Sequence, residues 1–189
     1  GLLGLRWGGG LCGLFSILLM FFTPRFFGHS MNNLKDVPFA VGYVLSLFYT
    51  VRLFDYFPIV KVRHALGLVV GIALALGTRS GGLILYPMLL MYAGLFYIGR
   101  SGGLHEFLRF KKHGAMLGNI LQLVLLVIIA SYLLGIALWP FALANPLRNV
   151  VYSLTKFTNY SIGLRTIFDG EQMMSNMLPW QYAPKFICI

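Results

Sequence analysis

Long apolar stretches separated by short polar segments run along the whole chain. Five of them approach the roughly 20 mostly apolar residues that cross a bilayer as one helix: 7–22, 37–54, 64–78, 81–98 and 115–139. A sixth begins near Tyr182 and ends with the chain at Ile189. The pattern predicts an all-α fold, a polytopic transmembrane helical bundle with about five full spans and a truncated sixth.

The composition agrees with this pattern. The chain has 189 residues, of which 58% are hydrophobic and 11% are charged, whereas a soluble domain carries roughly 25% charged residues. A chain this short has no core large enough to bury so much apolar surface, so lipid is the expected solvent. The chain opens on Gly1 instead of Met and closes inside an apolar stretch, so we expect 1–189 to be a single transmembrane domain fragment. A removed signal peptide would explain the first observation but not the second.

The positive charge is concentrated in the polar segments between the apolar stretches. Fifteen Lys and Arg stand against five Asp and Glu, a net charge of +10, but the cations lie mainly between the apolar stretches. This is the positive-inside pattern, not a basic DNA-binding face, and it excludes nucleic acid as the expected partner. It predicts cytoplasmic loops at 55–63 and 99–114. The 23–36 loop, the turn at Arg79 and the 140–179 segment then lie on the outer side.

Asp36 stands in the most polar of the outer loops. The same loop holds a histidine, two amides and two cations, namely Arg25, His29, Asn32, Asn33 and Lys35. One interpretation is that Asp36 caps the next helix, with Pro38 in its first turn. The other is that the cluster binds an anionic substrate at the membrane surface.

The remaining acidic residues have simpler interpretations. Asp55 and Glu106 lie among basic residues and are expected to be solvated loop charges. Asp169 precedes Gly170, a pair typical of a tight turn.

Arg79 interrupts an apolar region without an acidic neighbour in sequence. Such a charge lines a site or extends to the membrane surface. A guanidinium beside Gly81 and Gly82 suits a phosphate or pyrophosphate group. The small residues around it, including Gly67 and Gly71, favour close helix packing in lipid.

Other chemistry is sparse. Cys12 and Cys188 have neither disulfide nor metal-ligand spacing. His64, His105 and His113 fall at the edges of cytoplasmic loops and form no ligand set. Trp180 and Tyr182 are typical of aromatic anchors where a helix enters the membrane.

Three segments together, 24–39, 77–83 and 168–185, resemble a bacterial GT-C glycosyltransferase. The nearest group is the one related to protein O-mannosyltransferases and aminoarabinose lipid A transferases. The resemblance implies a bundle of GT-C type in the bacterial inner membrane. It also implies transfer of a sugar from a polyprenyl-phosphate donor to a glycan, lipid or protein acceptor on the non-cytoplasmic face.

The resemblance also implies roles for individual residues. Its general base, usually Asp, lies in an outer loop that would precede Gly1. Asp36 matches a second outer acidic position, which orients sugar or acceptor or holds a divalent cation. Arg79 stands where the family often has Lys and would contact the donor phosphate. The substrate-binding positions implied around it are Arg25, His29, Asn33 and Lys35.

Two other classes remain open. A transporter or flippase of lipid-linked glycans would place polar or broken-helix sites near the bilayer midplane, where this chain has few ionisable residues. A non-catalytic membrane scaffold would bind no sugar donor. The sequence leaves open which sugar moves, which acceptor receives it and whether a metal takes part.

Overall fold

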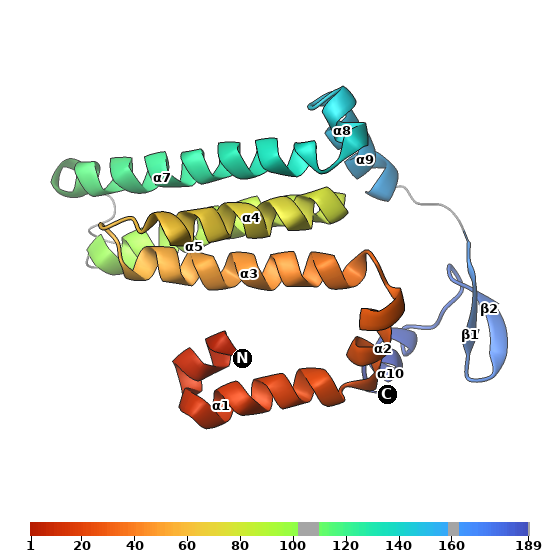
Figure 1. Ribbon diagram of the computed structural model, residues 1–189. Coiled ribbons are helices and arrows are strands. Elements are labelled where there is room, and N and C mark those ends of the chain that lie inside the picture. Colours follow the sequence, from red (N-terminus) through yellow and green to blue (C-terminus); the bar gives the residue numbers. More distant parts are fainter. Residues whose placement is uncertain (102–109, 159–162, 189) are drawn as a thin grey trace. The chain divides into compact units, whose positions relative to one another are not determined.

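The computed structural model describes residues 1–101, 110–158 and 163–188. Helices dominate this part of the chain, in agreement with the expected all-α class (Figure 1). The chain forms two compact units, Gly1–Val151 and Tyr152–Ile189.

The described part of the first unit consists of helices. They are α1 (Leu2–Phe22), α2 (Pro24–Asn32), α3 (Asp36–Asp55), α4 (Val62–Thr78), the 3-10 turn η1 (Ser80–Ile84), α5 (Leu85–Ser101), α7 (Phe110–Ala137) and α8 (Pro140–Ala144). Helix α9 (Arg148–Thr158) runs from this unit into the second.

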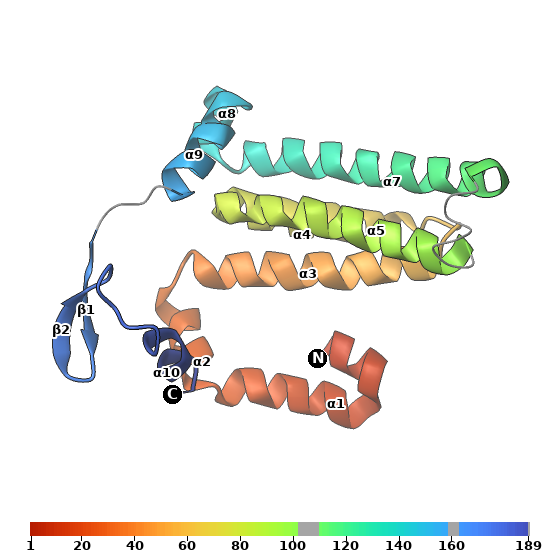
Figure 2. The ribbon, with the colours of Figure 1, turned by 180° about the vertical axis from the view of Figure 1, so that it is seen from behind.

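All five expected apolar stretches are helical. Four helical segments are long and apolar enough to cross a membrane: Leu2–Phe22, Asp36–Asp55, Ser80–Ser101 and Gly114–Ala137. The fifth, α4, has 17 residues and is therefore about 25 Å long. It lies between α3 and α7 in both ribbon views (Figures 1 and 2). The expected 99–114 loop is in part helical, and His105 and Glu106 lie outside the described residues.

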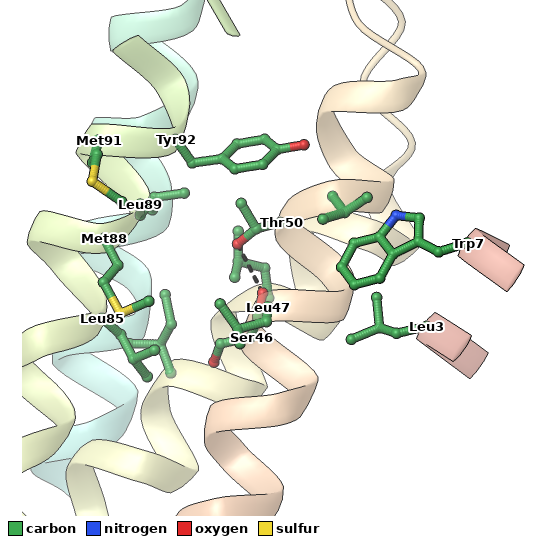
Figure 3. Close-up of a pocket in the computed structure, with 13 residues that line it drawn as sticks. Leu3, Trp7, Ser46, Leu47, Thr50, Leu85, Met88, Leu89, Met91 and Tyr92 are labelled. Atoms are coloured by element: carbon green, nitrogen blue, oxygen red, sulfur yellow. Dashed lines mark hydrogen bonds between the residues drawn. The ribbon is translucent and has the colours of Figure 1, made fainter. Parts of the chain in front are cut away.

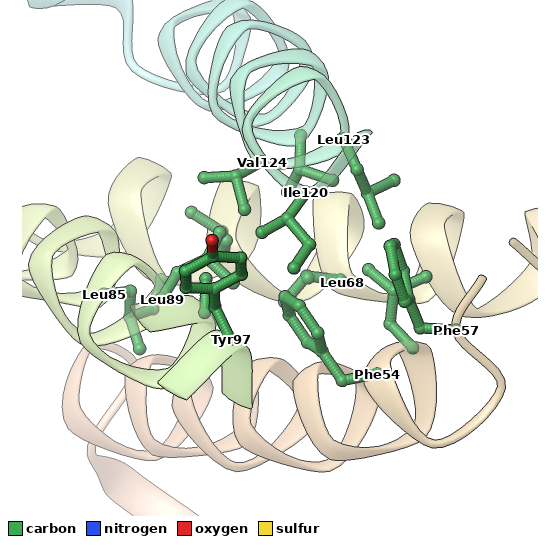
Figure 4. Close-up of a cluster of buried hydrophobic side chains, with 14 residues drawn as sticks. Phe54, Phe57, Leu68, Leu85, Leu89, Tyr97, Ile120, Leu123 and Val124 are labelled. Atoms are coloured by element: carbon green, nitrogen blue, oxygen red, sulfur yellow. The ribbon is translucent and has the colours of Figure 1, made fainter. Parts of the chain in front are cut away.

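The core of the first unit forms where α3, α4, α5 and α7 meet (Figure 4). Leu68 and Ile72 of α4 are almost completely buried, and Phe54 and Tyr97 bring aromatic rings from α3 and α5. Because α4 packs against α3, α7 and η1, it organises the bundle although it has only 17 residues.

Two glycines bring α3 and α4 close together. A Cβ on Gly42 would lie 2.7 Å from the backbone nitrogen of Ala75. A Cβ on Gly71 would lie 2.9 Å from the backbone nitrogen of Ser46. The expectation that small residues permit close packing is thus confirmed at Gly71.

Helix α1 is broken at Gly9, whose φ of 73° lies outside the helical region. The two arms fold back on each other, so that a Cβ on Gly1 would lie 2.9 Å from the side chain of Ile17. The arm that follows Gly9 has 13 residues up to Phe22, about 20 Å of helix. The stretch 7–22 is therefore not one straight spanning helix.

The expected outer segments also contain structure that the sequence did not reveal. The 23–36 loop contains the helix α2, and the 140–179 segment contains α8, α9 and a hairpin. In the hairpin, β1 (Arg165–Phe168) pairs antiparallel with β2 (Glu171–Met174), with Phe168 opposite Glu171.

The turn of that hairpin is the expected Asp-Gly pair. Asp169 and Gly170 have φ of 50° and 86°, which is typical of the two-residue turns that suit the twist of a hairpin. Helix α10 (Tyr182–Cys188) follows, so the predicted helix start near Tyr182 is confirmed. Lys185 of α10 forms a 2.6 Å ion pair with Asp169 and so fixes α10 to the turn.

Candidate functional site

Asp36 and Arg79, 43 positions apart in sequence, form an ion pair. Asp36 is the first residue of α3, and Arg79 follows the last residue of α4. The two helices are antiparallel, so both residues lie at the same end of the bundle (Figure 1). About half of each side chain is exposed, 51% for Asp36 and 44% for Arg79. The pair is therefore accessible to a ligand.

Asn33 fixes the carboxylate from the other side. Its amide nitrogen Nδ2 donates to Asp36 Oδ2 at 2.7 Å. Its Oδ1 accepts from the backbone N–H of Asp36 at 2.9 Å and of Lys35 at 3.2 Å. The interpretation of Asp36 as the helix cap is wrong, because Asp36 is the first residue of α3 and Lys35 occupies the cap position. The Asp36 carboxylate is bound by Arg79 and by Asn33 Nδ2, and it lies at the positive end of the helix dipole.

The turn that carries Arg79 is held by backbone contacts. Its own N–H donates to the carbonyl oxygen of Ala75 at 3.1 Å, and its carbonyl oxygen accepts from Gly82 N–H at 2.9 Å. A Cβ on Gly82 would lie 2.5 Å from the backbone nitrogen of Leu76, so any side chain would force the turn open. Gly81 is exposed beside this turn. The arrangement fixes the backbone of Arg79, and it places the guanidinium side chain beside a glycine backbone that a ligand can approach.

The structure gives fewer contacts between the other predicted binding residues and the Asp36–Arg79 pair. Lys35 is exposed, and it joins the site through its backbone N–H bond to Asn33. Arg25 and His29 lie in α2, and their side chains are outside the described part of the structure. The structure thus unites Asp36, Arg79 and Asn33.

An apolar groove lies between α1, α3 and α5 on the same bundle (Figure 3). Its volume is about 310 Å³, and its lining includes Trp7, Leu47, Met88 and Tyr92. Ser46, which also lines it, follows Asp36 by ten residues of α3, or about 15 Å. The periodicity of the sequence does not predict this groove. Its lining comes from several helices, and it forms only when they pack together.

Asp55 also differs from its expected role. Instead of a freely solvated loop charge, it is the last residue of α3 and forms a 2.5 Å ion pair with Arg6. Their side chains are 26% and 32% exposed. This pair fixes the first arm of α1 at the end of the bundle opposite Asp36.

Among the described residues, no three His, Cys, Asp or Glu side chains gather in a way that would hold a metal ion. No family model, curated protein or solved structure matches the chain.

Proposed function

We propose that this chain belongs to a multi-pass membrane glycosyltransferase of GT-C type that takes its sugar from a polyprenyl-phosphate donor. The observation that carries the proposal is the accessible Asp36–Arg79 pair at the end of an apolar bundle. The pair supplies a carboxylate at the start of α3 and a guanidinium at the end of α4. Both groups are exposed where the phosphate of a membrane lipid could bind.

Arg79 is proposed to bind the phosphate of the donor. A guanidinium forms bidentate, charge-assisted hydrogen bonds with carboxylate and phosphate alike. A phosphate oxygen can therefore replace the Asp36 carboxylate without any change in the fold. As the acceptor hydroxyl attacks the anomeric carbon and the polyprenyl phosphate departs, the negative charge grows on the leaving oxygen. A cation already in place stabilises that charge.

Asp36 is then released from Arg79 in the donor complex. Asn33 still holds one carboxylate oxygen through the 2.7 Å bond to Oδ2, so the other oxygen is free to orient a sugar or acceptor hydroxyl. The family that the sequence resembles takes its general base from a loop ahead of the matching region. Asp36 is accordingly proposed as a positioning group.

The groove between α1, α3 and α5 supports a lipid-linked donor. Its lining is mostly aliphatic and aromatic, and it begins about three helical turns along α3 from Asp36. A polyprenyl chain whose phosphate binds Arg79 would find apolar contacts at that distance.

A transporter or flippase of lipid-linked glycans is the alternative. Such proteins gather polar sites near the bilayer midplane. Here the central parts of α3, α4, α5 and α7 carry no Asp, Glu, Lys or Arg, and the ion pairs lie toward the helix ends. This distribution favours chemistry at one membrane surface.

The test is a transfer assay with the longest natural chain that contains this sequence, reconstituted in liposomes. It compares sugars carried on polyprenyl phosphate with the same sugars carried on nucleotides. We expect transfer from the lipid donors only, and a loss of at least about tenfold on Asp36→Asn, in the range that a positioned charged group contributes. Translocation of the lipid without sugar transfer would overturn the proposal in favour of the flippase.

A further inference from the structure

The end of the α3–α4 hairpin opposite the Asp36–Arg79 pair holds a polar cavity. It measures about 280 Å³ and is lined by Phe48, Tyr49, Arg52, Tyr56, Arg63 and His64. Two of these residues carry a guanidinium group. Arg52 lies on the last turn of α3, and Arg63 lies on the first turn of α4. The cavity shares no residue with the Asp36–Arg79 site.

His64 is buried at this cavity without a hydrogen-bond partner. Its relative exposure is 6%, and within the described part of the chain neither Nδ1 nor Nε2 has a hydrogen-bond partner. Buried polar groups are nearly always hydrogen-bonded, because a buried donor or acceptor without a partner has lost its hydration without compensation. The ring therefore lacks a partner that a bound group would supply.

The aromatic side chains fix the shape of the cavity. The Tyr56 ring stacks on His64 with centroids 5.4 Å apart and planes 14° apart. On the Tyr56 ring lies the ammonium of Lys61, 3.4 Å from the centroid. The Arg52 guanidinium lies 5.7 Å from the centroid of Phe48. A cation held over an aromatic ring is already ordered, so its side chain loses less conformational entropy when a ligand binds.

The local charge is strongly positive. Arg52, Lys61 and Arg63 lie within 12 consecutive positions. The acidic residue of this region, Asp55, is already paired with Arg6. An anion is therefore the ligand that the cavity favours.

From this geometry we infer that the cavity binds the phosphate of an anionic phospholipid. Arg52 and Arg63 contact the phosphate oxygens, and His64 donates to one of them. The aliphatic side chains beside the cations identify a lipid as the source of the phosphate. Ile59, Val60 and Val62 are 71%, 41% and 68% exposed, and Val60 and Val62 alternate with Lys61 and Arg63. Such alternation is suited to the boundary between headgroups and acyl chains.

Native mass spectrometry of the detergent-solubilised chain tests this inference. Phosphatidylglycerol is titrated in competition with phosphatidylcholine, and the fraction of protein carrying each lipid is measured. We expect preferential retention of phosphatidylglycerol, and a loss of about tenfold in its apparent affinity on Arg63→Gln or Arg52→Gln. Arg63 is exposed, so its replacement leaves folding intact. His64→Phe preserves the stacking on Tyr56 and should weaken retention as well.

Arg100→Gln is the matched control. The Arg100 guanidinium also lies 5.7 Å from the centroid of a phenylalanine ring, that of Phe96, but it lines a different cavity. Equal losses in Arg52→Gln, Arg63→Gln and Arg100→Gln would overturn the inference, since they would show a general effect of charge. Binding of glycerol 3-phosphate or inorganic phosphate with the same dependence on Arg52 and Arg63 would overturn the assignment to a lipid.

Discussion

The Asp36 carboxylate and the Arg79 guanidinium bind each other across the open end of the α3–α4 hairpin, with roughly half of each side chain exposed. An ion pair in this setting contributes only about 0.2–1 kcal/mol to stability, because water screens it. Its contribution to folding is thus too small to account for a charge placed in such apolar sequence. A role in binding gives it a sufficient reason.

Replacing either partner of this pair should leave the fold stable. We expect Asp36→Asn and Arg79→Gln each to lower the free energy of unfolding by less than about 1 kcal/mol. Thermal unfolding in detergent, followed by circular dichroism, measures the change. A loss of several kcal/mol would show that the pair is structural and would remove the argument for a binding role.

The contact between α3 and α4 should be sensitive to one methyl group. A Cβ on Gly42 meets backbone atoms of α4 at 2.7 Å and 2.8 Å, and backbone cannot move aside as a side chain can. Gly42→Ala should destabilise the bundle by about 1–3 kcal/mol. Gly94→Ala is the control, since a Cβ there meets nothing within 4 Å. It should be neutral or stabilising by up to about 1 kcal/mol. Equal effects of the two substitutions would contradict the close approach.

The fold of α1 depends on the positive φ of Gly9. An L-residue in that conformation costs roughly 1–2 kcal/mol, so Gly9→Ala should favour one continuous helix. Spin labels at Leu2 and Leu18 report the difference. An unbroken helix separates positions sixteen residues apart by about 24 Å, whereas the folded-back arms bring them much closer. The distance should be short in the original chain and should lengthen in Gly9→Ala. A long distance in both would contradict the break.

Substitutions at Asp169 in the hairpin turn of the second unit separate the effect of backbone conformation from the effect of charge. Asn adopts positive φ at least as readily as Asp, so Asp169→Asn should keep the turn while it removes the ion pair to Lys185. Asp169→Val should lose both, because a β-branched residue is strained at a φ of 50°. Proteolysis of the 163–188 region checks this, with faster cleavage expected for Asp169→Val than for Asp169→Asn. Equally fast cleavage of both variants, above the rate of the original chain, would show that the charge, not the conformation, holds the turn.

Much of the fold follows from the sequence because lipid imposes strong rules. The length and apolarity of each stretch placed the starts of α3 and α4 within two residues, and Asp169-Gly170 identified its own turn. The break at Gly9 was not foreseen, since Gly is compatible with a continuous helix as well as with a sharp turn. The short helix α2 was missed because a polar segment between two spans is typical of a loop.

The candidate site was only partly predictable for the same kind of reason. Arg79 stands out as a charge in apolar surroundings, Asp36 as the acidic residue of a polar loop, and the expected topology placed both on one side of the membrane. Their direct pairing depends on how α3 packs on α4, and that depends on Gly42 and Gly71 acting together. The unpartnered ring of His64 could not be foreseen at all, because burial of a polar atom is a property of the packed structure.

The most direct test of the proposed function is the affinity of the chain for a polyprenyl phosphate, measured in nanodiscs of phosphatidylcholine for the original sequence and three variants. We expect Arg79→Gln to bind at least about tenfold more weakly. Asp36→Asn should bind as tightly as the original or more so, because the guanidinium no longer has a competing carboxylate. Arg100→Gln, at the other end of the bundle, should be unchanged. Equal affinity in Arg79→Gln and in the original chain would contradict the assignment of Arg79 to the donor phosphate.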